Sequence, residues 1–158
     1  MGALGFFFLC VSLVFSFGFT RRSASAIANL VNGPRRKIEK ISSAILFPGH
    51  IIEIVAAGTC RKSTFTANQP RYIAINNSAV GQSVGTAYAS GDRIEIGVFL
   101  PGDQVYVLCP TGLTITLELI LHLDGAGRAT TVTTNAAFAR AKEAVTTSGD
   151  TLVLMELL

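Results

Sequence analysis

The chain of 158 residues has few side chains of the kinds that carry out chemistry: two histidines, three cysteines and no tryptophan. The histidines are His50 and His122. The cysteines, Cys10, Cys60 and Cys109, lie far apart, and neither a Cys-x-x-Cys nor a His-x-x-x-His pair occurs. Protein metal sites are built from such closely spaced ligands. The sequence therefore predicts no metal site and no cofactor.

The odd number of cysteines excludes complete pairing within the chain. Single thiols on strands usually act as small buried hydrophobic groups, so a structural role is predicted for the cysteines. Cys60 precedes Arg61 and Lys62. Because nearby positive charge favours the thiolate, Cys60 is the best candidate among them for a lowered pKa.

The first twenty residues lack charge altogether. An apolar run of about 18 residues is long enough to span a bilayer, and Ala24-Ser25-Ala26 has the small-x-small form of a signal cleavage site. No positive charge precedes the run, however, and Arg21-Arg22 lies between it and that site. Residues 1–20 remain open as a signal or anchor, an apolar arm that packs on a partner, or an over-extended reading frame. Because the next methionine is Met155, a later start would need another codon, for instance at Leu30 or Val31.

Charge is scarce, at 15% of residues, and unevenly distributed. Residues 1–40 hold six basic residues against the single acidic Glu39, a net charge of +5. The remaining residues hold seven basic and nine acidic side chains, a net charge of −2. The body therefore lacks the basic surface of a nucleic-acid-binding domain. The basic segment is typical of a solvated tail, or of an arm that touches nucleic acid or an acidic protein surface.

Aromatic residues make up 8% of the chain, and the abundant small and β-branched residues suit a pleated, half-buried surface. Residues 23–40 read as a linker, in which a short helix over residues 23–30 would end before Asn32-Gly33-Pro34. Further along, short apolar runs alternate with turn residues, which predicts a mainly β domain, either a small barrel or a tulip-like fold. The predicted strands are Ile51–Val55, Tyr72–Asn76, Arg93–Leu100, Gln104–Cys109, Thr114–Leu123, Arg128–Thr133 and Thr151–Leu157.

Two of these strands show informative alternation. Ile94, Ile96 and Val98 share one face of their strand, with polar residues or glycine on the other. In residues 117–123 the four leucines share one face, and Ile120 lies among polar residues on the other. The second pattern indicates core burial or a contact between subunits.

Turn chemistry separates the strands. Gly91-Asp92 and Gly102-Asp103 each precede an apolar strand, so we expect a positive φ at each glycine and a bond from each aspartate to the backbone two residues on. Residues 125–128, Gly-Ala-Gly-Arg, are too short for a phosphate-binding loop and predict a hairpin.

One motif favours an enzyme. Residues 81–85 match the Gly-x-Ser-x-Gly nucleophile elbow around Ser83. A triad would need His122 with Asp92 or Asp103 as the acid. The elbow requires a buried strand before it and a helix after it, yet Gly91-Asp92 closes the following segment within six residues. The motif is therefore interpreted as a chance match, and no catalytic residue is predicted.

The order of motifs along the chain carries a resemblance. A Gly-rich loop with Ala87-Tyr88-Ala89, Gly91-Asp92, an apolar strand, Pro101-Gly102-Asp103 and a second apolar strand follow one another. This order resembles the small head-decoration (cement) proteins of tailed bacteriophages. The resemblance extends upstream to residues 47–55, 58–62 and 71–76 and downstream to the hairpin at 123–128 and a closing strand at 139–144, so that it covers residues 45–158.

The resemblance implies a function. It predicts a β decoration domain over residues 45–158, behind an N-terminal arm or leader, apolar and then basic, over residues 1–44. Such a protein, as a homotrimer on the outer surface of the virion capsid, would bind the lattice of the major capsid protein and stabilise the expanded head. Neither a small-molecule substrate nor nucleic acid is expected as a partner. The alternative is an exported or membrane-anchored β domain, in which any membrane contact would be made by residues 1–20.

Overall fold

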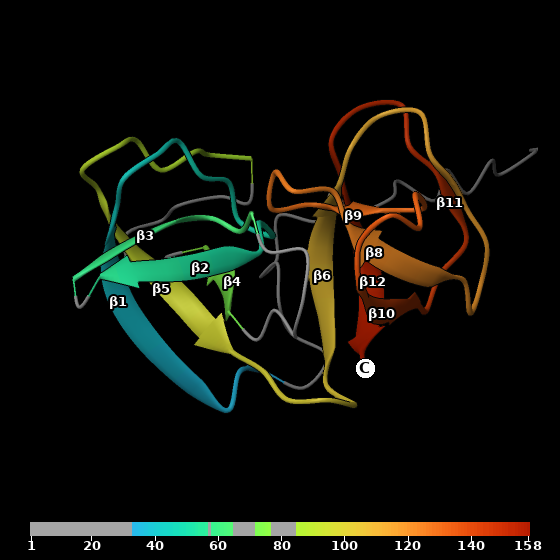
Figure 1. Cartoon of the computed structure of the whole chain (residues 1–158), viewed down its shortest axis with the longest axis horizontal. Coiled ribbons are helices and arrows are strands. Elements are labelled where there is room, and N and C mark those ends of the chain that lie inside the picture. Colours follow the sequence, from blue (N-terminus) through green and yellow to red (C-terminus); the bar gives the residue numbers. More distant parts are fainter. Residues whose placement is uncertain (1–32, 57, 65–71, 77–84) are drawn as a thin grey trace, which may run out of the picture.

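The chain is an all-β protein. Its computed structural model describes residues 33–56, 58–64, 72–76 and 85–158, and in that part of the chain every regular element is a strand. Figure 1 shows two lobes side by side, one built from β1–β5 and the other from β6–β12. The predicted mainly β, barrel-like fold is confirmed.

The first lobe is a five-stranded sheet in the order β2-β3-β1-β5-β4. An antiparallel bridge between Ile51 and Ile73 brings the two edge strands, β2 and β4, toward each other. The sheet is therefore curled into a barrel-like shape. Its strands are β1 (Arg36–Ser42), β2 (Ile52–Ala56), β3 (Thr59–Lys62), β4 (Tyr72–Ile75) and β5 (Arg93–Val98).

The second lobe is another five-stranded sheet, in the order β6-β12-β10-β8-β9, accompanied by the short ladder β11-β7. Its longest pairing joins β6 to β12 over six residue pairs. The strands are β6 (Gln104–Cys109), β7 (Thr114–Ile115), β8 (Ile120–Leu123), β9 (Ala129–Thr130), β10 (Ala137–Ala141), β11 (Val145–Thr146) and β12 (Thr151–Leu157).

The segment Gly49–Ile51 joins the two lobes through its backbone. Gly49 donates to the carbonyl of Ala74 in β4 (2.8 Å) and accepts from the amide of Leu108 in β6 (3.0 Å). Ile51 donates to the carbonyl of Gly127 in the β8–β9 turn (2.7 Å). This three-residue segment therefore bonds to both sheets.

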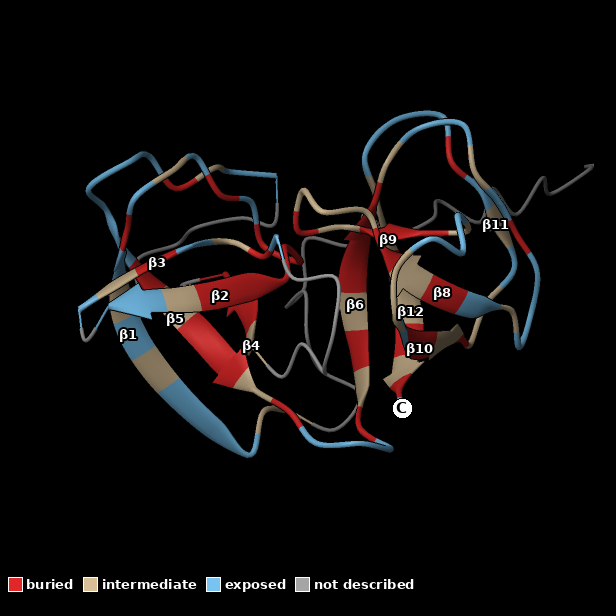
Figure 2. Cartoon of the chain, in the orientation of Figure 1, coloured by how far each residue is buried: buried red, intermediate tan, exposed pale blue. Residues whose placement is uncertain are grey.

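The hydrophobic core reflects this junction. A smaller cluster of buried residues, including Ile94, Ile96 and Tyr88, lies within the first sheet. The larger cluster fills the second lobe but also contains Ile51 and Phe99 from the first. In Figure 2 the buried residues accordingly line the strands of both lobes, while exposed residues mark the outer turns and most of β1.

Gly49 fits this junction because it lacks a side chain. It has a φ of +91°, and a Cβ there would meet the Cδ2 of Leu152 and lie 3.2 Å from the amide nitrogen of Leu108. Such a φ already disfavours a side chain. The backbone of the first lobe can therefore approach β6 and β12 closely enough to bond.

Five predicted strands coincide with observed ones within two residues at either end: those at 51–55, 72–76, 93–100, 104–109 and 151–157. The strand predicted over 114–123 is wrong in its middle, where Glu118 has a φ of +64° and turns the chain. Leu117 is consequently 59% exposed rather than aligned with the buried Leu121 and Leu123. The strand predicted over 128–133 is limited to Ala129–Thr130.

The linker predicted over 23–40 is wrong for Arg36–Lys40, which belong to β1. Residues 36–41 pair with β5 in antiparallel register. The regular β structure thus begins upstream of residue 45, within the segment assigned to the arm. The strand was not recognised because four of the five side chains from Arg36 to Lys40 are charged, which resembles a solvated tail. Residues 1–32, including the expected short helix, lie outside the described residues.

The predicted turn glycines are confirmed: Gly91 has a φ of +94° and Gly102 of +85°. The aspartates bond differently from the prediction. Asp103 accepts from the amide of Leu100 (2.8 Å), and Asp92 from the amide of Ala89 (2.7 Å), each three residues before it rather than two after. Each carboxylate therefore closes its own turn from the carboxyl-terminal side.

The hairpin predicted at residues 125–128 is also confirmed, since β8 and β9 pair antiparallel on either side of it. Asp124 holds the turn by accepting from the amides of Ala126 (2.7 Å) and Arg128 (2.9 Å) and from the Arg128 Nε (2.8 Å). This rigid turn presents the carbonyl of Gly127 to Ile51.

His50 is buried at the junction, with only 2% of its surface exposed. Its Nδ1 accepts a hydrogen bond from the amide of Phe47 (2.8 Å), which requires an unprotonated nitrogen. Burial, and next the positive charge of Lys62, lower the pKa of His50 from 6.5 to about 4. The folded protein therefore keeps this histidine neutral.

We predict that Gly102→Val lowers the free energy of unfolding by at least about 1 kcal/mol, because a β-branched residue is poorly accommodated at a φ of +85°. No atom lies within 4 Å of the position its Cβ would take, so the cost is conformational. Gly149→Val is the control, since that turn glycine also faces open space but lacks a positive φ. Urea denaturation of both variants checks this, and equal midpoints would contradict it.

We also predict that His50 makes the protein acid-sensitive. Between pH 6.5 and about 4 the unfolded chain binds a proton at this histidine that the folded protein excludes, so stability falls as the pH is lowered through that range. The pKa difference corresponds to roughly 3 kcal/mol.

His50→Asn keeps an acceptor for the Phe47 amide but does not titrate. Thermal melts from about pH 7 to about pH 4.5 should show a smaller loss of stability for this variant than for the wild type. The matched control, His122→Asn, should retain the wild-type loss. A wild-type acid profile in His50→Asn would contradict the assignment.

Candidate interaction surface

The inward face of the first sheet changes from apolar to charged at β1. One row across the sheet consists of Arg36 on β1, Val98 on β5 and Tyr72 on β4, because Val98 pairs with both of the others. The next row on the same face consists of Ile38, Ile96 and Ala74. Lys40 lies on this face opposite the buried Ile94. Two cations, with Ile38 between them, therefore border the apolar interior.

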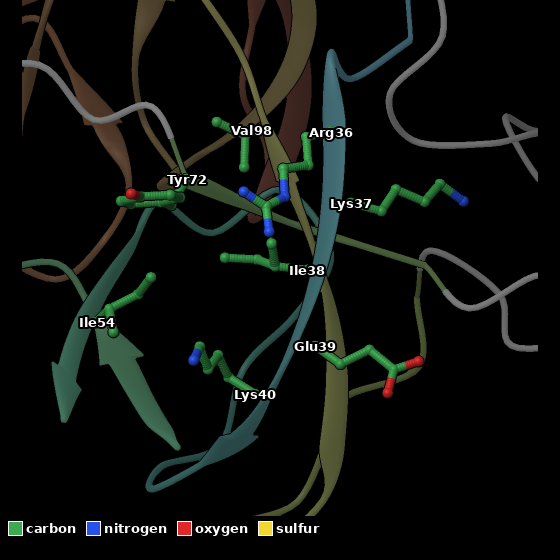
Figure 3. Close-up of a pocket in the computed structure, with 8 residues that line it drawn as sticks. All are labelled: Arg36, Lys37, Ile38, Glu39, Lys40, Ile54, Tyr72 and Val98. Atoms are coloured by element: carbon green, nitrogen blue, oxygen red, sulfur yellow. The ribbon is translucent and has the colours of Figure 1, made fainter. Parts of the chain in front are cut away.

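A groove of about 550 Å³ lies beside this face and is lined in part by Arg36, Ile38 and Lys40. Figure 3 shows Arg36, Ile38 and Lys40 directed from β1 toward the side where Tyr72 and Ile54 lie, whereas Lys37 and Glu39 point away from it. The lining residues are Arg36, Lys37, Ile38, Glu39, Lys40, Ile54, Tyr72 and Val98. A smaller hollow of about 230 Å³ adjoins it at Glu39 and Lys40 and is completed by Ile41, Gly58 and Arg93.

The two edges of β1 are paired to different extents. On one side, residues 36–41 pair with β5. On the other side, among the described strands, only Ile41 and Ser42 are paired, with β3. The N-terminal five residues of β1 therefore have one edge without a described strand beside it.

Hydrogen-bond directions identify the groups on that edge. The amide of Ile41 donates toward the β3 side, to Gly58 (2.9 Å), and that of Ser42 toward the β5 side, to Asp92 (2.8 Å). Because these directions alternate along a strand, the N–H and C=O groups of Lys37 and Glu39 face the open side. Their backbone lines the groove although their side chains point away from it.

Charges are paired on the outward face of β1. Lys37 bonds to Glu95 (3.3 Å), and Glu39 to Arg93 (2.9 Å), both across to β5. On the inward face, Arg36 is exposed and has no ion-pair partner among the described residues. The outward face is thus internally compensated, while the groove has a cationic end.

A buried carboxylate holds the start of β1 in place. Asp103, 1% exposed, accepts hydrogen bonds from Arg35 at 2.8 and 3.3 Å. Burial raises the pKa of Asp103, but the hydrogen bonds from Arg35 and from the Leu100 amide outweigh it and hold that pKa below its usual value. The strand that carries the groove is therefore tied to the β5–β6 turn.

A second buried carboxylate fixes the opposite wall. Glu53 on β2 accepts hydrogen bonds from Arg61 on β3 and from the Thr64 amide (3.1 Å). Burial raises the pKa of Glu53, but these hydrogen bonds lower it by more. The net pKa is below the usual value, so the carboxyl stays ionised. This pair positions β2, from which Ile54 reaches the groove.

The described residues that were considered for a catalytic triad each bond elsewhere. His122 Nδ1 lies 2.7 Å from the carbonyl of Asn135, while Asp103 is bonded to Arg35 and Asp92 to the Ala89 amide. Ser83 lies outside the described residues. Within the part of the chain that the structure describes, each candidate acid or base thus has a structural bond of its own.

The thiols behave as structural groups. Burial raises the pKa of the Cys60 thiol, and the smaller effect of Lys40 does not reverse this. The lowered pKa expected from Arg61 and Lys62 is therefore wrong. Burial, aided by the charge of Asp124, raises the pKa of Cys109 to about 12. Cys10 lies outside the described residues.

Two further searches concern the same residues. Among the described residues, no three His, Cys, Asp or Glu side chains are grouped so that they could hold a metal ion. The described part of the chain also contains no helix long and apolar enough to cross a membrane. Residues 1–20, on which a signal or anchor depends, lie outside it.

Sequence reasoning counted Arg36 and Lys40 as charges of a tail and missed their role in the groove. The available signal was weak: Arg36, Ile38 and Lys40 alternate with Lys37 and Glu39, a period of two that fits a strand. The pairing partner, β5, is more than fifty residues away. Only the register between them identifies which face is inward.

Comparison with known proteins supports the fold. Neither the protein-family models nor the curated proteins include a match to this chain. Among solved structures, the chain is similar to the N base of the head fiber gp8.5 of bacteriophage phi29, with a TM-score of 0.54 and 12% sequence identity. The alignment covers 78% of this chain and 93% of that one. At this identity the likeness is one of fold, and it extends over most of both chains.

Proposed function

We propose that this chain is a structural protein of a phage head: a decoration protein that binds the outer surface of the major capsid protein lattice and stabilises the expanded shell. The observation that carries the proposal is the fold likeness to the phi29 head fiber base, which covers 93% of that chain. The order of turn motifs, from Ala87-Tyr88-Ala89 to Pro101-Gly102-Asp103, independently resembles head-decoration proteins.

The surface of the described residues supports a binding role. Several large apolar side chains are at least a third exposed, and burying them against a lattice would contribute roughly 25 cal/mol per Å² before association costs. They are Ile41, Ile45, Phe47, Val55, Leu100, Leu117, Ile120, Val132 and Leu158. Their distribution over both lobes suits contacts with more than one neighbour.

A decoration protein acts by bridging neighbouring capsomers. We propose a homotrimer, because a trimer presents each contact three times to the symmetric lattice. Linked contacts act at high effective concentration, so individually weak contacts give slow release. The shared core and the bonds through Gly49–Ile51 would transmit load between the lobes without separating them.

The predicted outcome is that the full-length chain adds to expanded heads from outside. Heads prepared without it should lose DNA at a lower temperature and after milder osmotic shock, and addition of the purified chain should restore their resistance. Cryo-electron microscopy of the restored heads should show its density on the outer surface. Light scattering of the free chain should give three times the mass of one chain.

Two results would contradict the proposal: heads without the protein that are as robust as complete ones, or restored heads with no added density outside the shell. The full-length chain is needed for this experiment. A fragment that begins at residue 41 would lack most of β1, which pairs with β5 over residues 36–41.

A further inference from the structure

We infer that the outer face of a short two-stranded ribbon in the first lobe is a contact between two copies of this chain, related by a two-fold axis. The ribbon consists of residues 45–47 and 87–89 and is named the 45/87 ribbon. That the paired copies are neighbouring trimers on a phage head rests on the proposed function. The contact itself rests on the ribbon alone.

One residue pair holds the ribbon together. The amide of Leu46 donates to the carbonyl of Tyr88 (3.1 Å), and the amide of Tyr88 donates to that of Leu46 (2.7 Å). Both side chains are buried in the core of the first lobe. The hydroxyl of Tyr88 donates to the carbonyl of Ile75 (2.7 Å). Because side chains alternate along an extended chain, the residues on either side of this pair point outward.

The outer face of the ribbon is apolar and uneven. Ile45 and Phe47 lie on one strand, with 59% and 36% of their surface exposed. Ala87 and Ala89 lie on the other strand. Because the central pair exchanges both hydrogen bonds, the flanking pairs are of the closer, non-hydrogen-bonded kind. Ile45 therefore stands beside Ala89, and Phe47 beside Ala87. A ridge of two large side chains thus runs next to a trough floored by two alanines.

Side chains from the following turns fix both strands of the ribbon. The amide of Phe47 donates to Nδ1 of the buried His50 (2.8 Å), and the centroids of these two rings are 6.0 Å apart. On the other strand, the amide of Ala89 donates to the carboxylate of Asp92 (2.7 Å). The ridge and the trough are therefore preorganised, so little ordering is needed on contact.

Two such faces are complementary to each other. Consider two ribbons face to face, with a two-fold axis between them that runs parallel to the strands. This axis brings the ridge of each copy over the trough of the other. Ile45 then meets Ala89 of the second copy, Phe47 meets its Ala87, and both contacts occur twice. The arrangement is the isologous geometry of a two-fold interface, which requires a patch that fits itself.

The segments that form the ribbon carry no charge. Residues 43–49 and 85–91 contain no acidic or basic side chain. Beyond them, Arg93 is already paired with Glu39 (2.9 Å). A symmetric contact places each charge near its own copy, so charged residues in these segments would repel one another. A different protein would have to supply the same ridge and trough, whereas a second copy has both.

The contact is small. Four side chains, two of them alanines, bury far less than the roughly 1,000 Å² expected of a stable interface. Two copies should therefore pair weakly in dilute solution, and firmly only where they are already held side by side, because tethering raises the effective concentration. Neighbouring trimers on a head would meet that condition.

Exchange of the large and small residues tests the contact. Phe47→Ala removes half of the ridge and Ala87→Phe fills half of the trough, so each should weaken self-association at least about tenfold. The double variant carries the large residue on the other strand and fits itself again. Its self-association should return to within about threefold of the wild type.

Sedimentation equilibrium of the full-length chain at micromolar and millimolar concentrations measures this association. A wild-type mass that does not rise with concentration, or a double variant as weak as the single ones, would overturn the inference. If Phe47→Ala melts early, Ile45→Ala with Ala89→Ile makes the same exchange at the pair that does not contact His50, and that pair then decides.

Cross-linking identifies the residues that meet. Every protein used carries Cys10→Ser, since the two described cysteines are buried. One chain with Ile45→Cys and another with Ala89→Cys, mixed and oxidised, should form a mixed disulfide at least about fivefold faster than Leu117→Cys forms with Ala89→Cys. Leu117 is the matched control because it is also 59% exposed but lies in the second lobe. Equal rates for the two mixtures would contradict the assigned contact.

Heads separate this inference from the proposed function. If the chain ignores expanded heads, yet the wild type pairs and the exchange restores pairing, the proposed function fails and the self-contact stands. If the chain decorates heads but the exchange variants leave self-association unchanged, the self-contact is wrong and the proposed function stands. Loss of head binding in both single variants and in the double variant, without any effect on self-association, would assign the ribbon to the shell instead.

Discussion

The fold depends on three consecutive backbone positions, Gly49 to Ile51, that bond to both sheets. Gly49 bonds to β4 and β6, and Ile51 to the β8–β9 turn. His50 lies between them, buried and neutral, with its own contact to the Phe47 amide. Since Gly49 has a φ of +91° and a Cβ there would press on the backbone nitrogen of Leu108, the close approach of the lobes favours glycine. The two curled sheets are therefore fixed to each other by main-chain geometry as well as by the shared core.

Two buried carboxylates also hold neighbouring segments together, at the margins of the first sheet. Asp103 ties the start of β1 to the β5–β6 turn through Arg35, and Glu53 joins β2 to β3 through Arg61. Each compensates a buried negative charge with a more exposed cation and backbone hydrogen bonds. Such pairs specify geometry more than they add stability, because desolvation offsets much of their attraction. Here the geometry that they specify is that of the groove walls.

The proposed role on a phage head would depend on contacts made by both lobes. Apolar side chains exposed on both lobes provide area for such contacts. In a symmetric assembly such contacts would be repeated, which strengthens binding through multivalency.

The all-β class, five of the strands and the positive-φ turns at Gly91 and Gly102 were predictable from the sequence, because period-two patterns and glycine-aspartate turns are local signals. It did not reveal β1, whose charged residues become a strand only through pairing with β5 more than fifty residues away. Nor did it reveal the break at Glu118, where a left-handed residue interrupts a run of leucines. Two further facts follow only from the tertiary structure. Burial raises the pKa of the Cys60 thiol instead of its being lowered by nearby positive charge. Arg36 and Lys40 line a groove instead of belonging to a tail. The physical reason is the same throughout: register and burial are long-range properties, whereas charge and periodicity are read residue by residue.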